Sequence, residues 1–475
     1  MLFDNIFSTF AKQIPAAPTK GQTTAMQMLA DFIERPAEGN PLFILKGYAG
    51  TGKTSLISAL VKSLEAVHKN SVLLAPTGRA AKVFSVYANR KAYTIHKFLY
   101  RVQSKNGFLK FTRKPNKSAN TIFIVDEVSM ISDSPNEGLA DSRSLLDDLI
   151  SFVFEQKNCK LLFIGDNAQL PPVGCAESPA LDPEYLKRNF NVEITTHLLT
   201  EVVRQALHSG ILSNANGLRE KITDDDFSFP LFNLENCPDV KRINGGELAE
   251  EYATLYSDLS PEAIVTITRS NKRAYKFNQE IRNRILYHEN EICTGDYIMA
   301  VKNNYYWIDE TSEVGFIANG DIMEIMSINK IQELYGFRFA DVTVRLCDYA
   351  NYPNVDIKII LESLQSEGAA MSGEQNNALY QAVAEDYMEI ADKRKRYLAI
   401  KNDPFLNAVQ VKFSYSLTCH KTQGGQWKTV FIDQGFLADD GLDKEYLRWL
   451  YTALTRATRK VYLINFKDEF CITES

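Results

Sequence analysis

The stretch Pro41-Leu-Phe-Ile-Leu-Lys-Gly47-Tyr-Ala-Gly-Thr-Gly52-Lys53-Thr54 joins an apolar run to a glycine-rich turn, and it decides the fold class. The run has the length of a buried strand, and the pattern TSLISALVKSLEAVHKN that follows is typical of a helix. The turn fits G-x-x-x-x-G-K-[ST], in which backbone amides surround phosphates at a helix N-terminus. This context predicts a nucleotide phosphate site made of Gly47, Tyr48, Ala49, Gly50, Thr51, Gly52, Lys53, Thr54 and Ser55.

Four side chains near this turn suggest hydrolysis chemistry. Lys53 can reach the β- and γ-phosphates, and Thr54 can ligand Mg²⁺. The run TIFIVDEVSM places Asp126 and Glu127 at the carboxyl end of another strand, where ligands meet open α/β sheets. Asp126 can hold Mg²⁺ through water, and Glu127 can orient and deprotonate the attacking water. These residues predict Mg²⁺-dependent nucleotide hydrolysis but do not say what it drives.

The remaining pattern predicts two parallel sheets and an inserted barrel. Apolar runs at 41–47, 71–77, 121–127 and 160–166 alternate with helical stretches, which indicates a parallel sheet covered on both faces. Similar runs return at 261–270, 408–419, 428–435 and 461–466, and four β-rich runs within 296–363 suggest a small antiparallel barrel. A polar helical stretch follows from about 376 to 400. We therefore expect an α/β protein with domains at 1–205, at 206–295 with 411–475, and at 296–410 (the barrel with a helical extension).

Polar motifs follow several of these strands. Gln169, in GDNAQLPPVG, lies where a side-chain amide can hydrogen-bond a γ-phosphate. The others are Leu74-Ala-Pro76-Thr77-Gly-Arg79, Tyr93-Thr94-Ile-His96, Leu199-Thr-Glu-Val-Val-Arg204-Gln205, Thr418-Cys-His420-Lys421-Thr-Gln423-Gly424 and Tyr451-Thr-Ala-Leu-Thr-Arg456-Ala457. Eight motifs in this order, spanning roughly Gln22 to Ala457, resemble those of superfamily 1 helicases, in the RecD-like and Dda-like branch.

The resemblance implies an ATP-dependent helicase that moves 5′ to 3′ on single-stranded DNA, with ATP between two RecA-like motor domains. Gln22 resembles a glutamine that reads adenine, and Gln423 with Gly424 would also contact the nucleotide. Arg204 and Arg456 resemble two arginine fingers of the second motor domain. A guanidinium group suits that role because it stabilises charge on the transferring phosphoryl group. The resemblance also suggests a place in DNA repair or recombination.

The DNA contacts implied by the resemblance lie along the phosphodiester backbone. Hydroxyl and cationic side chains suit phosphates without reading sequence. Residues 101–115 carry an Asn106-Gly107 hairpin signal at the place where this branch has a duplex-splitting pin, so we expect a short pin insertion at about 101–118. Phe98 and Phe108 are candidates for base stacking, and Phe108 is a possible wedge. The backbone contacts expected are Pro76, Thr77, Thr94, His96, Thr418, His420 and Lys421.

Charge and composition limit the binding partners and the cell compartment that fit this chain. The 475 residues carry a net charge of −6, yet residues 66–125 contain twelve Lys and Arg and no acid. Such a basic block suits binding to a polyanion, although a solvated basic surface with no partner has the same composition. Seven scattered cysteines favour a reducing compartment, and no apolar run approaches a membrane span, so we expect a cytoplasmic protein without membrane contact.

Two alternatives stay open in the sequence. An RNA helicase would carry the same motifs, and a P-loop ATPase that acts as a switch or assembly protein would share the nucleotide site. We expect ATP and Mg²⁺ as cofactors and a monomer as the working form. The expected substrate is single-stranded DNA, or a duplex with a 5′ single-stranded tail.

Overall fold

The computed structural model describes most of the chain, and no helix within the described part is long and apolar enough to cross a membrane. Arg204, one of the two predicted arginine fingers, lies outside the described residues, as does the predicted hairpin turn at 106–107. The described ranges are 6–105, 108–135, 143–203, 209–235, 237–309, 311–312, 314–349, 351–437 and 442–472.

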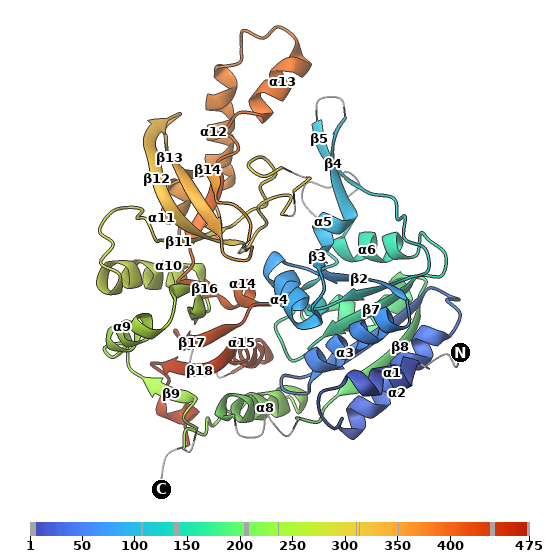
Figure 1. The fold of residues 1–475 in the computed structure, drawn as a ribbon. Helices are drawn as coiled ribbons and strands as arrows, with labels where there is room; N and C mark the ends of the chain where they lie inside the picture. The colour runs from blue at the N-terminus through green and yellow to red at the C-terminus, as the bar shows by residue number, and fades with distance from the viewer. Residues whose placement is uncertain are drawn as a thin grey trace.

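The first half forms a six-stranded parallel sheet. Its strands are β1 (Pro41–Gly47), β2 (Asn70–Ala75), β3 (Ala92–Thr94), β6 (Thr121–Val125), β7 (Lys160–Gly165) and β8 (Glu193–Leu199). They lie in the order β3-β2-β6-β7-β1-β8, and every neighbouring pair is parallel (Figure 1). The carboxyl ends of β1, β6 and β7 therefore meet at one edge, which brings their following loops together.

Helices cover both faces of this sheet. Phe43 and Leu45 of β1 pack in one apolar cluster with α2 and α3, whereas Leu42 and Ile44 pack in another with α5 and α6. Because successive side chains point to opposite faces, a strand buried on both sides reads as a continuous apolar run. The helices are α1 (Ile6–Gln13), α2 (Lys20–Glu34), α3 (Lys53–Ala66), α4 (Gly78–Ala88), α5 (Ile95–Leu99), α6 (Leu145–Val153) and α7 (Pro183–Asn189).

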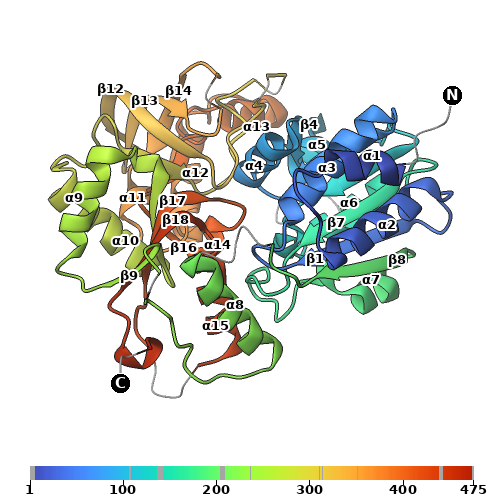
Figure 2. The ribbon, with the colours of Figure 1, turned by 60° about the horizontal axis from the view of Figure 1, so that its bottom comes forward.

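The second half contains a five-stranded parallel sheet, and Figure 2 shows the two halves side by side. Its strands are β9 (Val240–Ile243), β10 (Ile264–Thr268), β16 (Ser416–Thr418), β17 (Trp427–Asp433) and β18 (Ala457–Ile464), in the order β16-β10-β17-β18-β9. Its helices are α8 (Gly210–Thr223), α9 (Leu248–Asp258), α10 (Asn271–Glu280), α14 (Cys419–Thr422) and α15 (Lys444–Leu454). The predicted pair of parallel sheets is confirmed.

A closed five-stranded barrel is inserted between β10 and β16, as predicted, but it is not wholly antiparallel because β14 pairs with β15 in parallel. Its strands are β11 (Tyr297–Ala300), β12 (Ile322–Leu334), β13 (Phe337–Leu346), β14 (Val355–Ile360) and β15 (Val409–Phe413). Between β14 and β15 the chain forms α11 (Glu362–Gln365), α12 (Gly373–Glu385) and α13 (Lys393–Lys401). Figure 1 shows α12 and α13 projecting from the barrel. The predicted helical stretch at 376–400 is therefore two helices.

The run 408–419 is not one strand of the second sheet, contrary to the sequence interpretation. β15 pairs with β11 of the barrel, and β16 pairs with β10 of the second sheet. The chain changes sheets at Ser414 and Tyr415: Ser414 donates to the Tyr297 carbonyl, and the Tyr415 carbonyl accepts from Thr266. No glycine or proline marks this crossing, so the apolar run reads as continuous.

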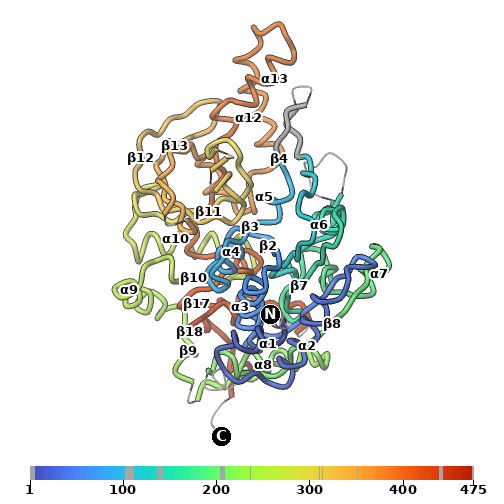
Figure 3. Tube along the Cα trace, turned by 45° about the vertical axis from the view of Figure 1, so that its right-hand side comes forward, coloured from blue at the N-terminus to red at the C-terminus, as the bar shows by residue number. Residues whose placement is uncertain are grey.

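The predicted hairpin is present as β4 (Tyr100–Lys105) and β5 (Phe108–Arg113), which pair antiparallel from Tyr100–Arg113 to Lys105–Phe108. It lies at the same end of the molecule as α12 and α13 (Figures 1 and 3). The side chains of residues 102–111, including Phe108, lie outside the described part of the structure. The wedge role of Phe108 stays a prediction.

Candidate nucleotide site and nucleic-acid interface

The glycine-rich loop after β1 has the backbone that a phosphate cradle needs. Gly50 and Gly52 have φ values of 75° and 78°, a region that strongly favours glycine. A Cβ at Gly52 would also lie 2.4 Å from Nε2 of Gln22. Both the positive φ and this close approach therefore disfavour a side chain at position 52. Lys53 then begins α3, which places the positive end of the helix at the loop.

Gln22 supports this loop through its side-chain amide. Its Nε2 donates to the Thr51 carbonyl at 3.0 Å, and its Oε1 accepts from the Thr19 amide at 3.0 Å within a capping box of α2. Both amide atoms are therefore engaged, and Gln22 is buried. The predicted contact with adenine requires part of this network to rearrange, and it stays a prediction.

Lys53 and Asp166 form the polar centre of the site. The Lys53 ammonium donates to the Tyr48 carbonyl at 2.8 Å and lies 3.9 Å from the Asp166 carboxylate. The Tyr451 hydroxyl of α15 donates to the same carboxylate at 2.7 Å and accepts from the Ala49 amide at 2.8 Å. The second half of the chain thus contacts the phosphate loop directly. Tyr451 lies inside a sequence motif, but its role depends on the docking of α15, which the sequence does not reveal.

Asp126 and Glu127 follow β6 and line one pocket with Lys53, Thr54 and Tyr87. Hydroxyl and carboxylate oxygens are the ligands that Mg²⁺ prefers, so Thr54 and Asp126 fit the ion. Glu127 has φ 53° and ψ 38°, which a non-glycine residue seldom adopts and which is common at functional sites. Its backbone amide donates to Asp126 Oδ1 at 2.8 Å.

Burial makes these two carboxyl groups harder to ionise. It raises the pKa of Asp126, partly offset by the hydrogen bond from Tyr87. It raises the pKa of Glu127 to about 7, while the positive charge of Arg456 lowers it. A carboxylate with a pKa near neutrality suits a general base, because it balances basicity against the fraction ionised.

Arg456 comes from the second half and is 4% exposed. Its guanidinium donates to the Thr452 carbonyl at 3.0 Å and to the Gly425 carbonyl at 3.4 Å. Its positive charge also lowers the pKa of Glu127. The arginine-finger role of Arg456 stays a prediction.

Gln169, Gln423 and Gly424 lie where the two halves meet. Oε1 of Gln169 is buried without a hydrogen-bond partner, and Gln169 lines a polar cavity with Asp166. Nε2 of Gln423 donates to the Leu170 carbonyl at 2.7 Å. A Cβ at Gly424 would lie 2.7 Å from Cβ of Ala80 in α4. The described contacts of Gln423 and Gly424 therefore join the two halves, and their contact with nucleotide stays a prediction.

The predicted DNA contacts of the first half follow β2 and β3. Pro76 and Thr77 are half-buried, and the Thr77 hydroxyl accepts from the Ala80 amide as the N-cap of α4. Thr94 is buried and caps α5 in the same way through the Lys97 amide. These hydroxyl groups already accept a backbone hydrogen bond, but each can still donate to a phosphate.

Two predicted DNA contacts, His96 and Phe98, lie in α5, and both side chains are partly buried. Burial lowers the pKa of His96 to about 4, so this side chain is neutral at pH 7 and offers no cationic contact. The Phe98 ring lies 5.7 Å from that of Phe152 and 6.1 Å from that of Phe123, edge to face. Phe98 thus packs partly against the apolar core over the sheet, and its contact with a base stays a prediction.

The predicted contacts of the second half gather around α14. Thr418 and Lys421 line one cavity beside α10, and Thr418 makes no side-chain cap hydrogen bond. Burial lowers the pKa of Lys421 to about 8. It also lowers the pKa of His420, which the charge of Glu445 partly offsets. Lys421 is therefore the predicted contact whose charge responds most readily to pH.

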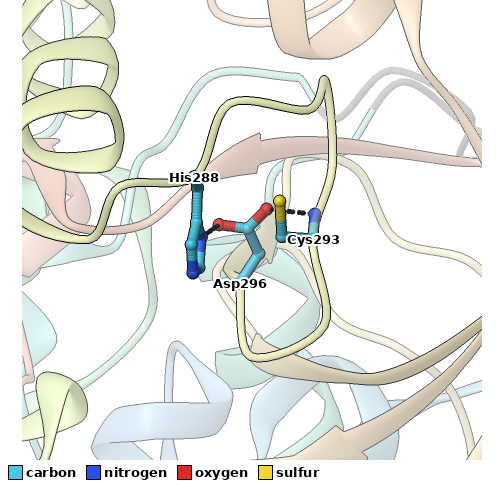
Figure 4. A group of neighbouring side chains, drawn as sticks. All are labelled: His288, Cys293 and Asp296. Carbon is cyan, nitrogen blue, oxygen red and sulfur yellow. Dashed lines mark hydrogen bonds and ion pairs between the residues drawn. The ribbon is translucent and has the colours of Figure 1, made fainter.

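A separate cluster at the base of the barrel contains His288, Cys293 and Asp296, whose ligand atoms lie within 4.8 Å of one another (Figure 4). The Asp296 carboxylate accepts from His288 Nδ1 at 2.9 Å and from the Cys293 amide at 2.7 Å. It also accepts two hydrogen bonds from the buried guanidinium of Arg282, at 2.9 and 2.8 Å. A cation beside Arg282 would be repelled, so this cluster is an ion-pair network and not a metal centre.

Two family models match parts of the chain. Residues 18–229 match the AAA domain family, and residues 413–464 match the UvrD-like helicase C-terminal domain. The two matches contain the phosphate loop, Asp126, Glu127, Gln169, Lys421 and Arg456.

Among curated proteins, the ATP-dependent RecD2 DNA helicase of Deinococcus radiodurans is 32% identical over 204 residues, which are 43% of this chain and 25% of that protein. The ATP-dependent DNA helicase dda of Enterobacteria phage T4 is 26% identical over 368 residues, 72% of this chain and 77% of that protein. The chain thus spans about a quarter of RecD2 and three quarters of dda. Among solved structures, a Bacteroides Pif1 helicase in complex with ADP-AlF3 and ssDNA aligns over 97% of this chain and 95% of that chain, with 15% identity and a TM-score of 0.48.

Proposed function

We propose that this chain, which belongs to the superfamily 1 helicases of the RecD-like and Dda-like branch, is an ATP-dependent DNA helicase that moves 5′ to 3′ along single-stranded DNA. The observation that carries the proposal is the contact of the second half with the nucleotide site. Tyr451 bridges the Ala49 amide and the Asp166 carboxylate, and Arg456 acts on Glu127. A nucleotide between two sheets can change their separation when it is hydrolysed, which is what a translocating motor requires.

Each residue at the nucleotide site has a separate task in this proposal. Lys53 and the loop amides bind the phosphates, and Glu127 takes a proton from the attacking water. Mg²⁺, held by Thr54 and Asp126, would neutralise charge on the phosphate oxygens. Arg456 stabilises the charge that develops on the transferring group, and Arg204 is its proposed partner. Gln169 contacts the γ-phosphate and transmits its loss to the adjoining half.

The domain boundaries follow the pairing of the strands. We assign 1–205 to the first motor domain and 206–295 with the C-terminal residues to the second. The predicted barrel segment was 296–410, but β15 pairs within the barrel, so we place the return to the second motor domain after Phe413. The hairpin β4–β5 would act as the pin. We take the working form to be a monomer in the cytoplasm.

The proposed DNA track crosses both motor domains. Pro76, Thr77 and Thr94 would contact the backbone in the first motor domain, and Thr418, His420 and Lys421 in the second. Lys421 lies within a match to a helicase domain, and the basic block at 66–125 contains the first three. Because these two groups of contacts lie on separate motor domains, each can bind the strand in turn as ATP binds and leaves.

Duplexes with one single-stranded tail test the direction of movement. We expect ATP-dependent unwinding of a duplex with a 5′ tail and none with a 3′ tail, measured by strand displacement. Lys53→Ala should abolish the activity, because the phosphates lose their cationic contact. Unwinding from the 3′ tail alone would refute the proposed polarity. ATPase that single-stranded DNA does not stimulate would favour a P-loop switch, and stimulation by RNA alone would favour an RNA helicase.

The affinity for single-stranded DNA should fall as the pH rises from 7 to 9. Lys421 has a pKa of about 8 in the free protein, and a bound phosphate favours its charged form. Its contact is therefore complete below pH 8 and weakens above it. Between pH 7 and pH 9, the magnitude of the slope of log affinity against log salt concentration should decrease by about 0.7. This is the value for one phosphate contact on a single strand.

Arginine provides the control for this titration, since it stays charged throughout the range. Lys421→Arg should remove the pH dependence of the salt slope. Lys412→Arg should keep the pH dependence but move it to lower pH. Burial and Lys421 lower the pKa of Lys412 to about 8 as well, and its ammonium donates to the Ser366 carbonyl, so it is not the phosphate contact. An arginine that stays charged in the same cavity repels the Lys421 ammonium and lowers its pKa. An unchanged pH dependence in Lys421→Arg would exclude Lys421 as the titrating contact.

A further inference from the structure

Tyr87 lies near the end of α4, and its hydroxyl reaches into the nucleotide site. It donates to Asp126 Oδ2 at 2.5 Å, and it lines the pocket that also contains Lys53 and Thr54. We propose that Tyr87 is a positioning residue that ties the Mg²⁺ carboxylate of Asp126 to helix α4 and thereby to the DNA-contact loop at Thr77. This inference rests on the function proposed above and assigns a role to a residue outside the motifs.

The Asp126 carboxylate has a fixed orientation because each of its oxygens has one donor. Oδ2 accepts from Tyr87, and Oδ1 accepts from the Glu127 amide. Without the Tyr87 hydroxyl, the bond from the amide one residue away is the only hydrogen bond within the described residues that would limit rotation of the carboxylate. Side chains that hydrogen-bond a metal ligand in this way set its orientation and commonly affect metal affinity as strongly as the ligand geometry does.

Helix α4 connects this hydroxyl to three other parts of the molecule. Ser58 of α3, the helix that begins at the phosphate loop, donates to the Tyr87 carbonyl at 2.7 Å. At the other end of α4, Thr77 is the N-cap, and the Gly424 loop of the second motor domain packs on Ala80. Lys82 donates to the Cys347 carbonyl of the barrel at 2.8 Å.

These contacts make α4 the element shared by the DNA track, the domain interface and the metal carboxylate. The helix is 11 residues long, about 16 Å, so a tilt at the Thr77 end moves Tyr87 as part of one rigid segment. A strand bound at Thr77, or a shift of the Gly424 loop, would then change how Asp126 is held. Tyr87 thus provides a route by which single-stranded DNA stimulates hydrolysis.

Tyr87→Phe removes the hydroxyl and keeps the ring, which stacks on Phe84 at 5.0 Å between centroids. The first readout needs no turnover: binding of a fluorescent ADP analogue is measured as Mg²⁺ is titrated. We expect the variant to need about 10- to 100-fold more Mg²⁺ for half-maximal binding. The second readout is the ratio of ATPase with and without single-stranded DNA, which we expect to fall by about 5-fold or more.

Tyr387→Phe is the matched control. Its hydroxyl donates to the Asp403 carboxylate at 2.9 Å in the helical extension, so the same type of bond is lost away from the nucleotide. This variant should keep the wild-type Mg²⁺ midpoint and the wild-type stimulation. A Tyr87→Phe variant with an unchanged Mg²⁺ midpoint overturns the positioning role, even if its turnover falls. A shifted midpoint with unchanged stimulation overturns the link to DNA. If single-stranded DNA does not raise the ATPase rate of the wild type, the proposed function is contradicted. In that case the Mg²⁺ titration still tests the positioning role of Tyr87.

Discussion

Replacing Arg456 by alanine is expected to lower kcat for ATP hydrolysis by about 10³- to 10⁵-fold, the range associated with loss of an arginine finger. The physical reason is the position of its charge: it comes from the second motor domain, is 4% exposed, and acts on Glu127 across the interface. A charge in a site that excludes water stabilises the transferring phosphoryl group far more than a charge in water does. Steady-state ATPase in the presence of single-stranded DNA measures the effect.

The controls separate catalysis from folding. Arg459→Ala removes an exposed arginine three residues along the chain and should leave kcat unchanged. Arg456→Lys keeps the charge but loses the planar fork, so its kcat should lie between those of the alanine variant and the wild type. ATP binding and the melting temperature should stay close to the wild type in Arg456→Lys. A kcat within tenfold of the wild type in Arg456→Ala would contradict the finger role.

The strands that proved easiest to predict are those buried on both faces. β1, β6 and β7 read as apolar runs because helices cover the sheet from both sides, and their ends placed Lys53, Asp126 and Gln169 correctly at one edge. β8 was missed. It lies at the edge of the sheet, and its sequence EITTHLL mixes polar and apolar residues because much of it is only partly buried.

The contacts across the interface could not be read from the sequence. Tyr451 and Asp166 are 285 residues apart, and nothing local says that α15 docks on the phosphate loop. Tyr87 carries no motif at all. The same limit applies at α5, where the sequence does not reveal that His96 and Phe98 are each partly buried by neighbouring packing.

Glu127→Gln should slow hydrolysis by about 10²- to 10⁴-fold, the usual contribution of a general base, while ATP and single-stranded DNA still bind. Glutamine has nearly the same shape as glutamate but cannot accept the proton of the attacking water. Because the carboxylate is buried, removing its charge also relieves its desolvation cost, so the fold should be no less stable than the wild type. Because ATP binds but is hydrolysed slowly, the variant should accumulate in its ATP-bound form. A single-turnover experiment should show slow hydrolysis of tightly retained ATP.

Glu184→Gln is the matched control, because Glu184 is an exposed residue of α7 paired with Lys187 on the surface. It should hydrolyse ATP at the wild-type rate. If Glu127→Gln retained more than about a tenth of the wild-type turnover, the proton would have another acceptor, since a lost base costs at least 10²-fold. Asp166 is another carboxylate that lines the pocket, but it already accepts from Tyr451 and faces Lys53. We therefore assign the base to Glu127, whose backbone adopts an uncommon conformation next to Asp126.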